Sequence, residues 1–407
     1  MSHRSIVTPA QQRAALASAS LTLALALGIR GNFGLFLAPL ALHGVPIGMT
    51  AFAIALHNLS WGLAQPLVGA WADRAGTARI QLLGGVLFAA GLALPALYPA
   101  TWAVVFGIGI LTGLGIACTG WGVSLAGLSR CFTATERPRA LAIANAGCSA
   151  GQLAGPLVTA LLLAWGGPQW ALAGLALMIL PTMFLGYPLD RAMLEPPAPR
   201  KSIAAVRGAL GEPAFVLLTL GFFTCGFQLS FLSTHLPGYL SLCGMSASAG
   251  AWALTIVGAA NIVGATLCAH MGGRASPHLT LAGLYTARGV AILIFWLAPK
   301  TELSLVLFAV VMGLTWLGTV PLTNSVIARL YGIGDLGALF GMCFISHQIG
   351  GFVGAWVGGL VFEYSGSYDI AFAATALAGF TAAAFNLPIR MPVRSRWRVA
   401  DTGGIQE

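Results

Sequence analysis

The sequence predicts an all-α protein that crosses a membrane many times. Of its 407 residues, 57% are hydrophobic and only 8% are charged, and the mean hydropathy is +0.86. A soluble domain carries about 25% charged residues. The apolar runs repeatedly reach the roughly 20 residues that a helix needs to cross a bilayer, and they are continuous, whereas barrel strands alternate. No cleavable signal peptide is expected at the N-terminus.

The apolar runs define twelve expected helices, which form two sets of six. A polar, proline-rich stretch separates the sets, so we expect an N-terminal half at 1–188, a cytoplasmic linker at 189–211, and a C-terminal half with a cytoplasmic tail at 212–407. The expected helices are 16–41, 47–70, 79–97, 101–128, 137–164, 168–188, 212–240, 247–271, 279–298, 302–329, 336–362 and 368–388.

The basic residues predict the orientation. With this set of helices, seventeen of the 20 Lys and Arg residues fall on the side that carries both termini, and only Lys300 falls on the other. This bias places both termini in the cytoplasm, and we expect a bacterial inner membrane. The seventeen are Arg4, Arg13, Arg74, Arg79, Arg130, Arg137, Arg139, Arg191, Arg200, Lys201, Arg207, Arg274, Arg329, Arg390, Arg394, Arg396 and Arg398.

Other functional classes lack their motifs. The net charge of +9 is spread over separate loops, which does not predict a nucleic-acid surface. The seven cysteines show no metal or disulfide spacing, and no catalytic set or phosphate-binding loop is present. We therefore expect no enzyme, no cofactor and no metal. A membrane sensor without transport activity stays as an alternative, although sensors usually add a soluble domain.

Glycines at four-residue spacing relate the two halves. Gly147, Gly151 and Gly155 in the fifth expected helix correspond to Gly350, Gly354 and Gly358 in the eleventh. Such spacing favours close helix packing. Aligning Pro39 with Pro237 pairs Arg30 with Gln228. Two related six-helix halves are typical of an alternating-access transporter.

The loop after the second expected helix, "GAWADRAGTAR" (69–79), resembles the major facilitator superfamily motif G-x-x-x-D-R-x-G-x-x-R. The matching residues are Gly69, Asp73, Arg74, Gly76 and Arg79. The motif implies a tight turn whose charges hold neighbouring helices in one state.

Further stretches resemble particular members of that superfamily. "GQLAGPLV" (151–158) is similar to an element associated with antiporters and includes Gly151, Gly155 and Pro156, but the later glycines are absent. "GIRGNFGLFLAPL" and residues 346–369 resemble bacterial monocarboxylate-porter and oxalate/formate-antiporter members. The resemblance implies that helices 1, 4, 7 and 10 line a central cavity and that helices 3, 6, 9 and 12 lie outside it.

Arg30 lies deep inside the first apolar run, and no acidic residue falls in the interior of any expected helix. A mid-membrane arginine is costly unless it faces water or a partner. An anionic substrate is one such partner, because guanidinium binds carboxylate bidentately. The alternative is a structural clamp on carbonyls and polar side chains. For Arg288, which has a similar depth in the peripheral ninth helix, structural pairing is favoured over anion binding.

Other polar residues at membrane depth are candidates for substrate contact, although each also suits helix-to-helix hydrogen bonding. They are His57, Trp121, Gln228, His235, Asn324, His347 and Gln348. We predict a monomeric transporter of a small mono- or dicarboxylate; exchange for a counter-anion, proton coupling and facilitated diffusion all stay open as its mode. An exporter of drugs or other solutes is the alternative.

Overall fold

The structure is a computed structural model that describes residues 7–133, 135–194, 203–274, 276–332 and 335–391, except for the side chains of residues 203–204, 269 and 272–274. The described residues are helical throughout their regular structure and contain no strand. Among the basic residues expected in the cytoplasm, Arg4, Arg200, Lys201, Arg394, Arg396 and Arg398 lie outside the described residues, as does the side chain of Arg274.

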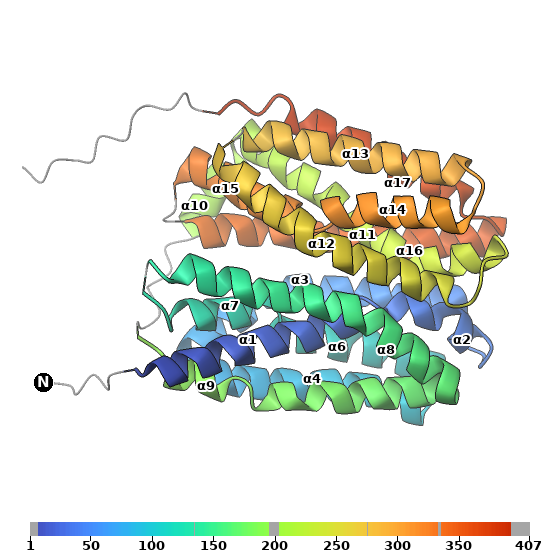
Figure 1. Ribbon diagram of the computed structural model, residues 1–407, viewed down its shortest axis with the longest axis horizontal. Coiled ribbons are helices and arrows are strands. Elements are labelled where there is room, and N and C mark those ends of the chain that lie inside the picture. The colour runs from blue at the N-terminus through green and yellow to red at the C-terminus, as the bar shows by residue number, and fades with distance from the viewer. Residues whose placement is uncertain (1–6, 134, 195–202, 275, 333–334, 392–407) are drawn as a thin grey trace, which may run out of the picture.

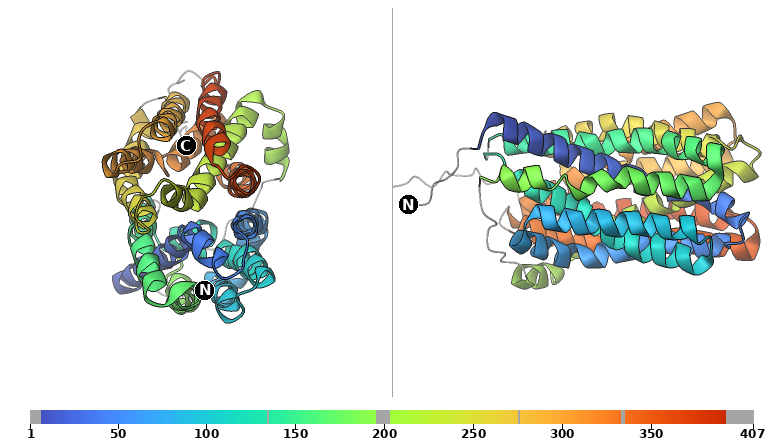
Figure 2. Two further views of the ribbon diagram at one scale, coloured as in Figure 1. Left: turned by 90° about the vertical axis from the view of Figure 1, so that its right-hand side faces the viewer. Right: turned by 90° about the horizontal axis from the view of Figure 1, so that it is seen from below.

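The helices form two bundles that lie side by side, visible end-on in the left view of Figure 2. The first bundle contains α1 (Pro9–Arg30), η1 (Phe33–Phe36), α2 (Leu37–Ala41), α3 (Ile47–Ala75), α4 (Thr77–Leu97), α5 (Thr101–Val104), the π-helical η2 (Val105–Leu111), α6 (Thr112–Thr119), α7 (Trp121–Ser129), α8 (Arg137–Ile179), η3 (Leu180–Met183) and α9 (Tyr187–Arg191). After it come α10 (Ile203–Leu210), α11 (Pro213–Leu242), α12 (Ala249–Arg274), α13 (Pro277–Leu297), α14 (Glu302–Thr315), α15 (Thr319–Tyr331), α16 (Leu336–Ser365) and α17 (Asp369–Asn386).

Eleven helical stretches in the described chain are long and apolar enough to cross a membrane. The stretch Arg137–Arg191 is 55 residues long, which is much more than one crossing requires. It reverses at Gly167, whose φ of 72° breaks the helical path, so it supplies two crossings. The expected twelve spans are therefore present, and the start of α1 and the end of α17 lie at the same end of the molecule (Figure 1). We call this end the terminal end.

The glycine-rich faces pack as their spacing predicts. An added Cβ at Gly151 would lie 2.0 Å from the carbonyl oxygen of Ala24 in α1, and one at Gly354 would lie 2.2 Å from that of Phe227 in α11. Helices α1 and α8, and likewise α11 and α16, therefore approach with their backbones almost in contact.

This packing also corrects the predicted correspondence between the halves. Gly151 packs on the backbone of Ala24, and its counterpart Gly354 packs on the backbone of Phe227. Six residues after Ala24, Arg30 therefore corresponds to Ser233, six residues after Phe227. The predicted pairing of Arg30 with Gln228 was wrong because Pro39 and Pro237 do not occupy equivalent positions in the two halves.

Three spans that reach the middle of the molecule are interrupted. The first span breaks after Arg30, the fourth breaks at the extended Gly120 between α6 and α7, and the tenth breaks between α14 and α15. A break leaves backbone carbonyls and N–H groups without helical partners, which is tolerated in a membrane only beside a cavity or other protein groups. These breaks therefore mark the functional region.

Candidate functional site

A cavity of about 1410 Å³ lies between the two bundles. Along α3 it is lined by Asn58, Trp61, Gln65 and Gly69, which occupy successive turns toward the terminal end. Arg207 and Leu210 of α10 also line it. The cavity thus extends from the middle of the bundle to the terminal end. No described residue of α4, of the stretch 168–191, of α13 or of α17 lines it, in agreement with the expectation that spans 3, 6, 9 and 12 lie outside.

Tight contacts between the bundles close the opposite end. An added Cβ at Gly34 of η1 would lie 2.1 Å from the carbonyl oxygen of Ser233 in α11. An added Cβ at Gly359 of α16 would lie 2.6 Å from the Cβ of Ala51 in α3. Phe52 also packs edge-on against Trp356, with ring centroids 5.5 Å apart. The cavity is therefore blind at this end.

Arg30 lies at this blind end, where α1 stops. Its Nη2 donates to Oδ1 of Asn58 at 2.7 Å, and its guanidinium carbon lies 4.9 Å from the ring centre of Trp61. Its Nε is buried without a hydrogen-bond partner. Within the described chain, no carboxylate comes within ion-pair distance of Arg30. The positive charge of Arg30 is therefore stabilised only by the amide of Asn58 and the indole ring of Trp61 among these contacts. A bound anion could neutralise it.

Asn58 connects Arg30 to the other bundle. Its Nδ2 donates to Oγ of Ser230 in α11 at 2.9 Å, and its backbone carbonyl accepts from Nε2 of Gln348 in α16 at 3.4 Å. His347 lies beside this group, with its Nδ1 3.0 Å from Oε1 of Gln348. The floor of the cavity is thus a polar network that spans both halves.

Several sequence candidates lie on the cavity wall, namely Arg30, Trp121, Asn324, His347 and Gln348. Trp121 packs near Trp61, with ring centroids 6.0 Å apart. The amide of Asn324 donates to the carbonyl of Val320 within its own helix.

Three candidates do not reach the cavity. Gln228 is fully buried and donates to the carbonyl of Thr375 in α17. His235 is held between Tyr368 and the carbonyl of Ala355. His57 packs against Thr112, with its Nδ1 2.7 Å from the threonine hydroxyl. Gln228 and His235 of α11 therefore contact neighbouring helices and not the cavity.

Sequence reasoning missed Trp61, Gln65, Ser149 and Gln152 on the wall. A signal was available for the first two, because Asn58, Trp61 and Gln65 recur at helical spacing and form one face. Trp61 also donates from Nε1 to Oε1 of Gln65 at 2.8 Å, which fixes the orientation of its ring.

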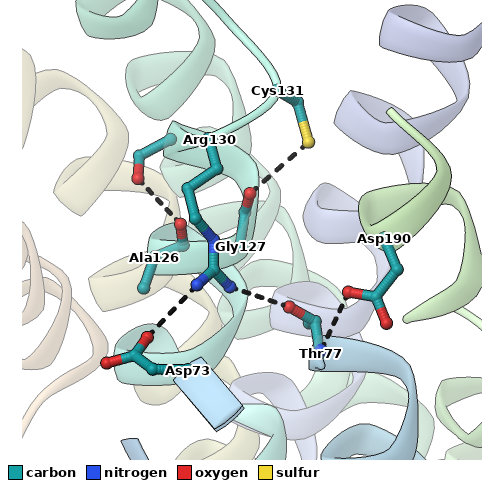
Figure 3. Close-up of polar contacts among 8 residues, drawn as sticks. Asp73, Thr77, Ala126, Gly127, Arg130, Cys131 and Asp190 are labelled. Carbon is teal, nitrogen blue, oxygen red and sulfur yellow. Dashed lines mark hydrogen bonds and ion pairs between the residues drawn. The ribbon is translucent and has the colours of Figure 1, made fainter. Parts of the chain in front are cut away.

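At the terminal end, the loop between α3 and α4 is held by charged residues (Figure 3). Gly76 adopts φ 89°, which allows the tight turn. Asp73 forms an ion pair with Arg130 at 3.2 Å, and Arg130 also donates to Thr77 Oγ1 at 3.2 Å.

From the other side of this loop, Asp190 of α9 accepts the backbone N–H groups of Thr77 and Ala78 at 2.8 and 2.9 Å. Arg130 and Asp190 were not predicted to act at this site. Arg74 and Arg79 are exposed, and neither forms an ion pair with a carboxylate in the described part of the chain. Their predicted gating role gains no support from the contacts.

A profile of the family described as Major Facilitator Superfamily matches residues 16–355. The chain belongs to this superfamily.

Individual relatives agree with membership of the major facilitator superfamily. The chain is 26% identical to the uncharacterized MFS-type transporter YcxA of Bacillus subtilis, over 83% of this chain and 85% of the relative. It is 27% identical to monocarboxylate transporter 13 of Rattus norvegicus, over 86% and 82%. A shorter match, 36% identical over 37% of this chain and 28% of the relative, is to a multidrug resistance protein B homolog of Mycobacterium tuberculosis. The protein is a multi-pass membrane transporter of small molecules, and not an enzyme.

Proposed function

We propose that this transporter moves a small organic anion, a mono- or dicarboxylate, by alternating access. The supporting observation is Arg30, a cation at the blind end of the cavity that has no carboxylate partner among the described residues. The carboxylate of the substrate would occupy that position. Trp121, Asn324, His347 and Gln348 complete the proposed site, and His57, Gln228 and His235 are left out because they face other helices.

The transport cycle would rock residues 1–188 against residues 212–407. The terminal end would be cytoplasmic in a bacterial inner membrane, so the present conformation would face inward. His347 is the only described histidine that lines the cavity, and a ring nitrogen of imidazole can accept and donate a proton. It is therefore the candidate for proton coupling, with exchange of two anions as the other mode.

The test uses purified protein in liposomes and a panel of labelled short mono- and dicarboxylates. Separate arms supply a pH gradient, an internal counter-anion, or neither. Saturable uptake of at least one acid is expected, and the arm that accelerates it identifies the coupling mode. Absence of uptake for every acid in all arms would rule out the proposal.

Arg30→Ala should lower the apparent affinity for that acid about 10- to 100-fold, because a charge-assisted hydrogen bond to a carboxylate is lost. Arg30→Lys should retain part of the affinity, since it keeps the charge but not the bidentate geometry. Arg139→Ala, which removes an exposed arginine, is the control. Unchanged affinity in a folded Arg30→Ala protein would remove Arg30 from the substrate site.

The volume and aromatic wall of the cavity favour one alternative, export of larger amphipathic solutes. A typical small-molecule pocket has a volume of about 300–1,000 Å³, and this cavity of about 1410 Å³ exceeds that range. Including lipophilic dyes in the liposome panel distinguishes the two functions, because dye transport should not depend on Arg30.

A further inference from the structure

The second buried arginine, Arg288, lies in the peripheral α13 and is fully buried (0% exposed). Among the described residues, its hydrogen bonds go to other parts of the chain, at α11 and at the end of α14. It donates from Nη2 to the backbone carbonyls of Thr315 and Trp316, the latter at 2.7 Å. It also donates from Nε to Thr315 Oγ1 at 3.3 Å and from Nη1 to Cys225 Sγ at 3.2 Å.

Thr315 and Trp316 are where the tenth span breaks. Helix α14 ends at Thr315 and α15 begins at Thr319, so the last carbonyls of α14 have no helical partner. Those carbonyls also carry the negative end of the dipole of α14, which a cation stabilises. Arg288 therefore satisfies both the hydrogen-bonding and the charge requirements of the break, and its own charge requires no anion.

The residues at the break form part of the cavity wall. Trp316, Leu317, Thr319 and Val320 line the cavity, whereas Arg288 does not. Asn261 of α12 supports the same break from the other side, because its Oδ1 accepts the N–H of Leu317 at 3.0 Å. Its Nδ2 donates to Ser149 of α8 in the opposite half at 3.2 Å.

The fourth span shows a related arrangement without a charge. At its break, Ser124 donates to the carbonyl of Thr119 at 2.7 Å, and Gln81 of α4 donates to Ser124 at 3.0 Å. In each half, a side chain from an outer helix therefore supports the broken inner helix that contributes a tryptophan to the cavity.

We propose that Arg288 is a positioning residue for the substrate cavity: it holds the break between α14 and α15 so that residues 316–320 form the cavity wall. This role depends on the cavity being the transport path and not on the charge of the substrate. It can therefore fail or succeed independently of the carboxylate proposal.

The test measures the exposure of the wall directly and requires no substrate. Val320→Cys is introduced together with Cys243→Ser, which removes the exposed native cysteine. The rate at which a water-soluble methanethiosulfonate reagent labels position 320 is then compared with and without Arg288→Met and Arg288→Gln. Size-exclusion chromatography selects folded protein, and the same protein without Val320→Cys gives the background.

Arg288→Met should change the labelling rate at least about fivefold, because the carbonyls of Thr315 and Trp316 lose their donor and the break rearranges. Arg288→Gln should restore most of the original rate, since a neutral amide still donates hydrogen bonds. Gln81→Met, the matched change at the break of the other half, should leave labelling at position 320 unchanged.

An unchanged rate in folded Arg288→Met would overturn the proposal. If Arg288→Met does not yield folded protein, Arg288→Gln decides the question alone: a rate within twofold of the parent supports positioning by hydrogen bonds. A rate changed fivefold or more in folded Arg288→Gln would show that hydrogen bonding does not hold the wall, and would overturn it.

Discussion

At the scale of single residues, Asp190 shows how a local hydrogen bond fixes a functional loop. Its carboxylate accepts the N–H groups of Thr77 and Ala78, which are the first residues of α4 and have no helical partners. It thus caps α4 from a distant helix, in the position that N-cap side chains normally occupy. Together with the Asp73–Arg130 ion pair, it holds the α3–α4 loop against α7 and α9 within one half.

We predict that Asp190→Ala destabilises the protein by about 0.5–2 kcal/mol, the usual cost of losing an N-cap. Asp190→Asn should retain part of the stability because its amide oxygen still accepts. Thermal unfolding in detergent measures both changes. Equal unfolding temperatures for Asp190→Ala and the parent protein would contradict the capping role.

Single-residue outcomes also show what the sequence could predict. The depth of Arg30 and the lack of an acidic neighbour in the sequence indicated either a cavity position or a structural clamp; Arg30 lines the cavity, whereas Arg288, at a similar depth, does not. Gln228 and His235 are also polar residues at membrane depth, but the contacts of their side chains depend on the rotation of α11 about its axis. That rotation is set by packing on α16 and α17, which one sequence does not specify.

At the scale of helices, close packing of α8 on α1 depends on glycine at each contact. An added Cβ at Gly151 would lie 2.0 Å from a backbone oxygen, which cannot move without shifting α1. By contrast, Gly283 of α13 has no atom within 4 Å of such a Cβ.

We therefore predict that Gly151→Ala costs about 1–3 kcal/mol or more, the range for overpacking a tight core, and lowers the unfolding temperature clearly. Gly283→Ala, the matched control, should unfold at or slightly above the parent temperature, because alanine favours helix more than glycine does. The prediction fails if the two variants unfold together.

Some features of the helices could also be predicted from the sequence, and others could not. The four-residue glycine spacing and the apolar lengths predicted the packing and the number of spans. The breaks at Gly120 and at 316–318 were not predicted, since each span is continuously apolar. Their partners, Ser124 and Arg288, are brought close only by the folded structure.

At the scale of the whole molecule, the cavity is closed at one end only, and the closure lies between the two halves. Ala51 and Gly359 face each other there with Cβ positions 2.6 Å apart. A disulfide needs a Cβ separation of roughly 3.8 Å, so a small separation of α3 and α16 would accommodate one.

We predict that Ala51→Cys with Gly359→Cys, in a Cys243→Ser background, cross-links on oxidation and stops transport. Labelling of a cysteine at position 320 should continue, because the terminal end stays open. Reduction should restore uptake. Full uptake by protein shown to be cross-linked would mean that α3 and α16 need not separate during transport.

The size of the cavity has a consequence for selectivity. A space of about 1410 Å³ is many times the roughly 30 Å³ that one water molecule occupies in the liquid. A short acid would therefore keep most of its hydration shell in the vestibule and lose water only beside Arg30, Asn58 and Trp61. Acids that differ only far from the carboxylate should therefore be bound with nearly equal affinity. Acids that differ next to the carboxylate should be bound with clearly different affinity.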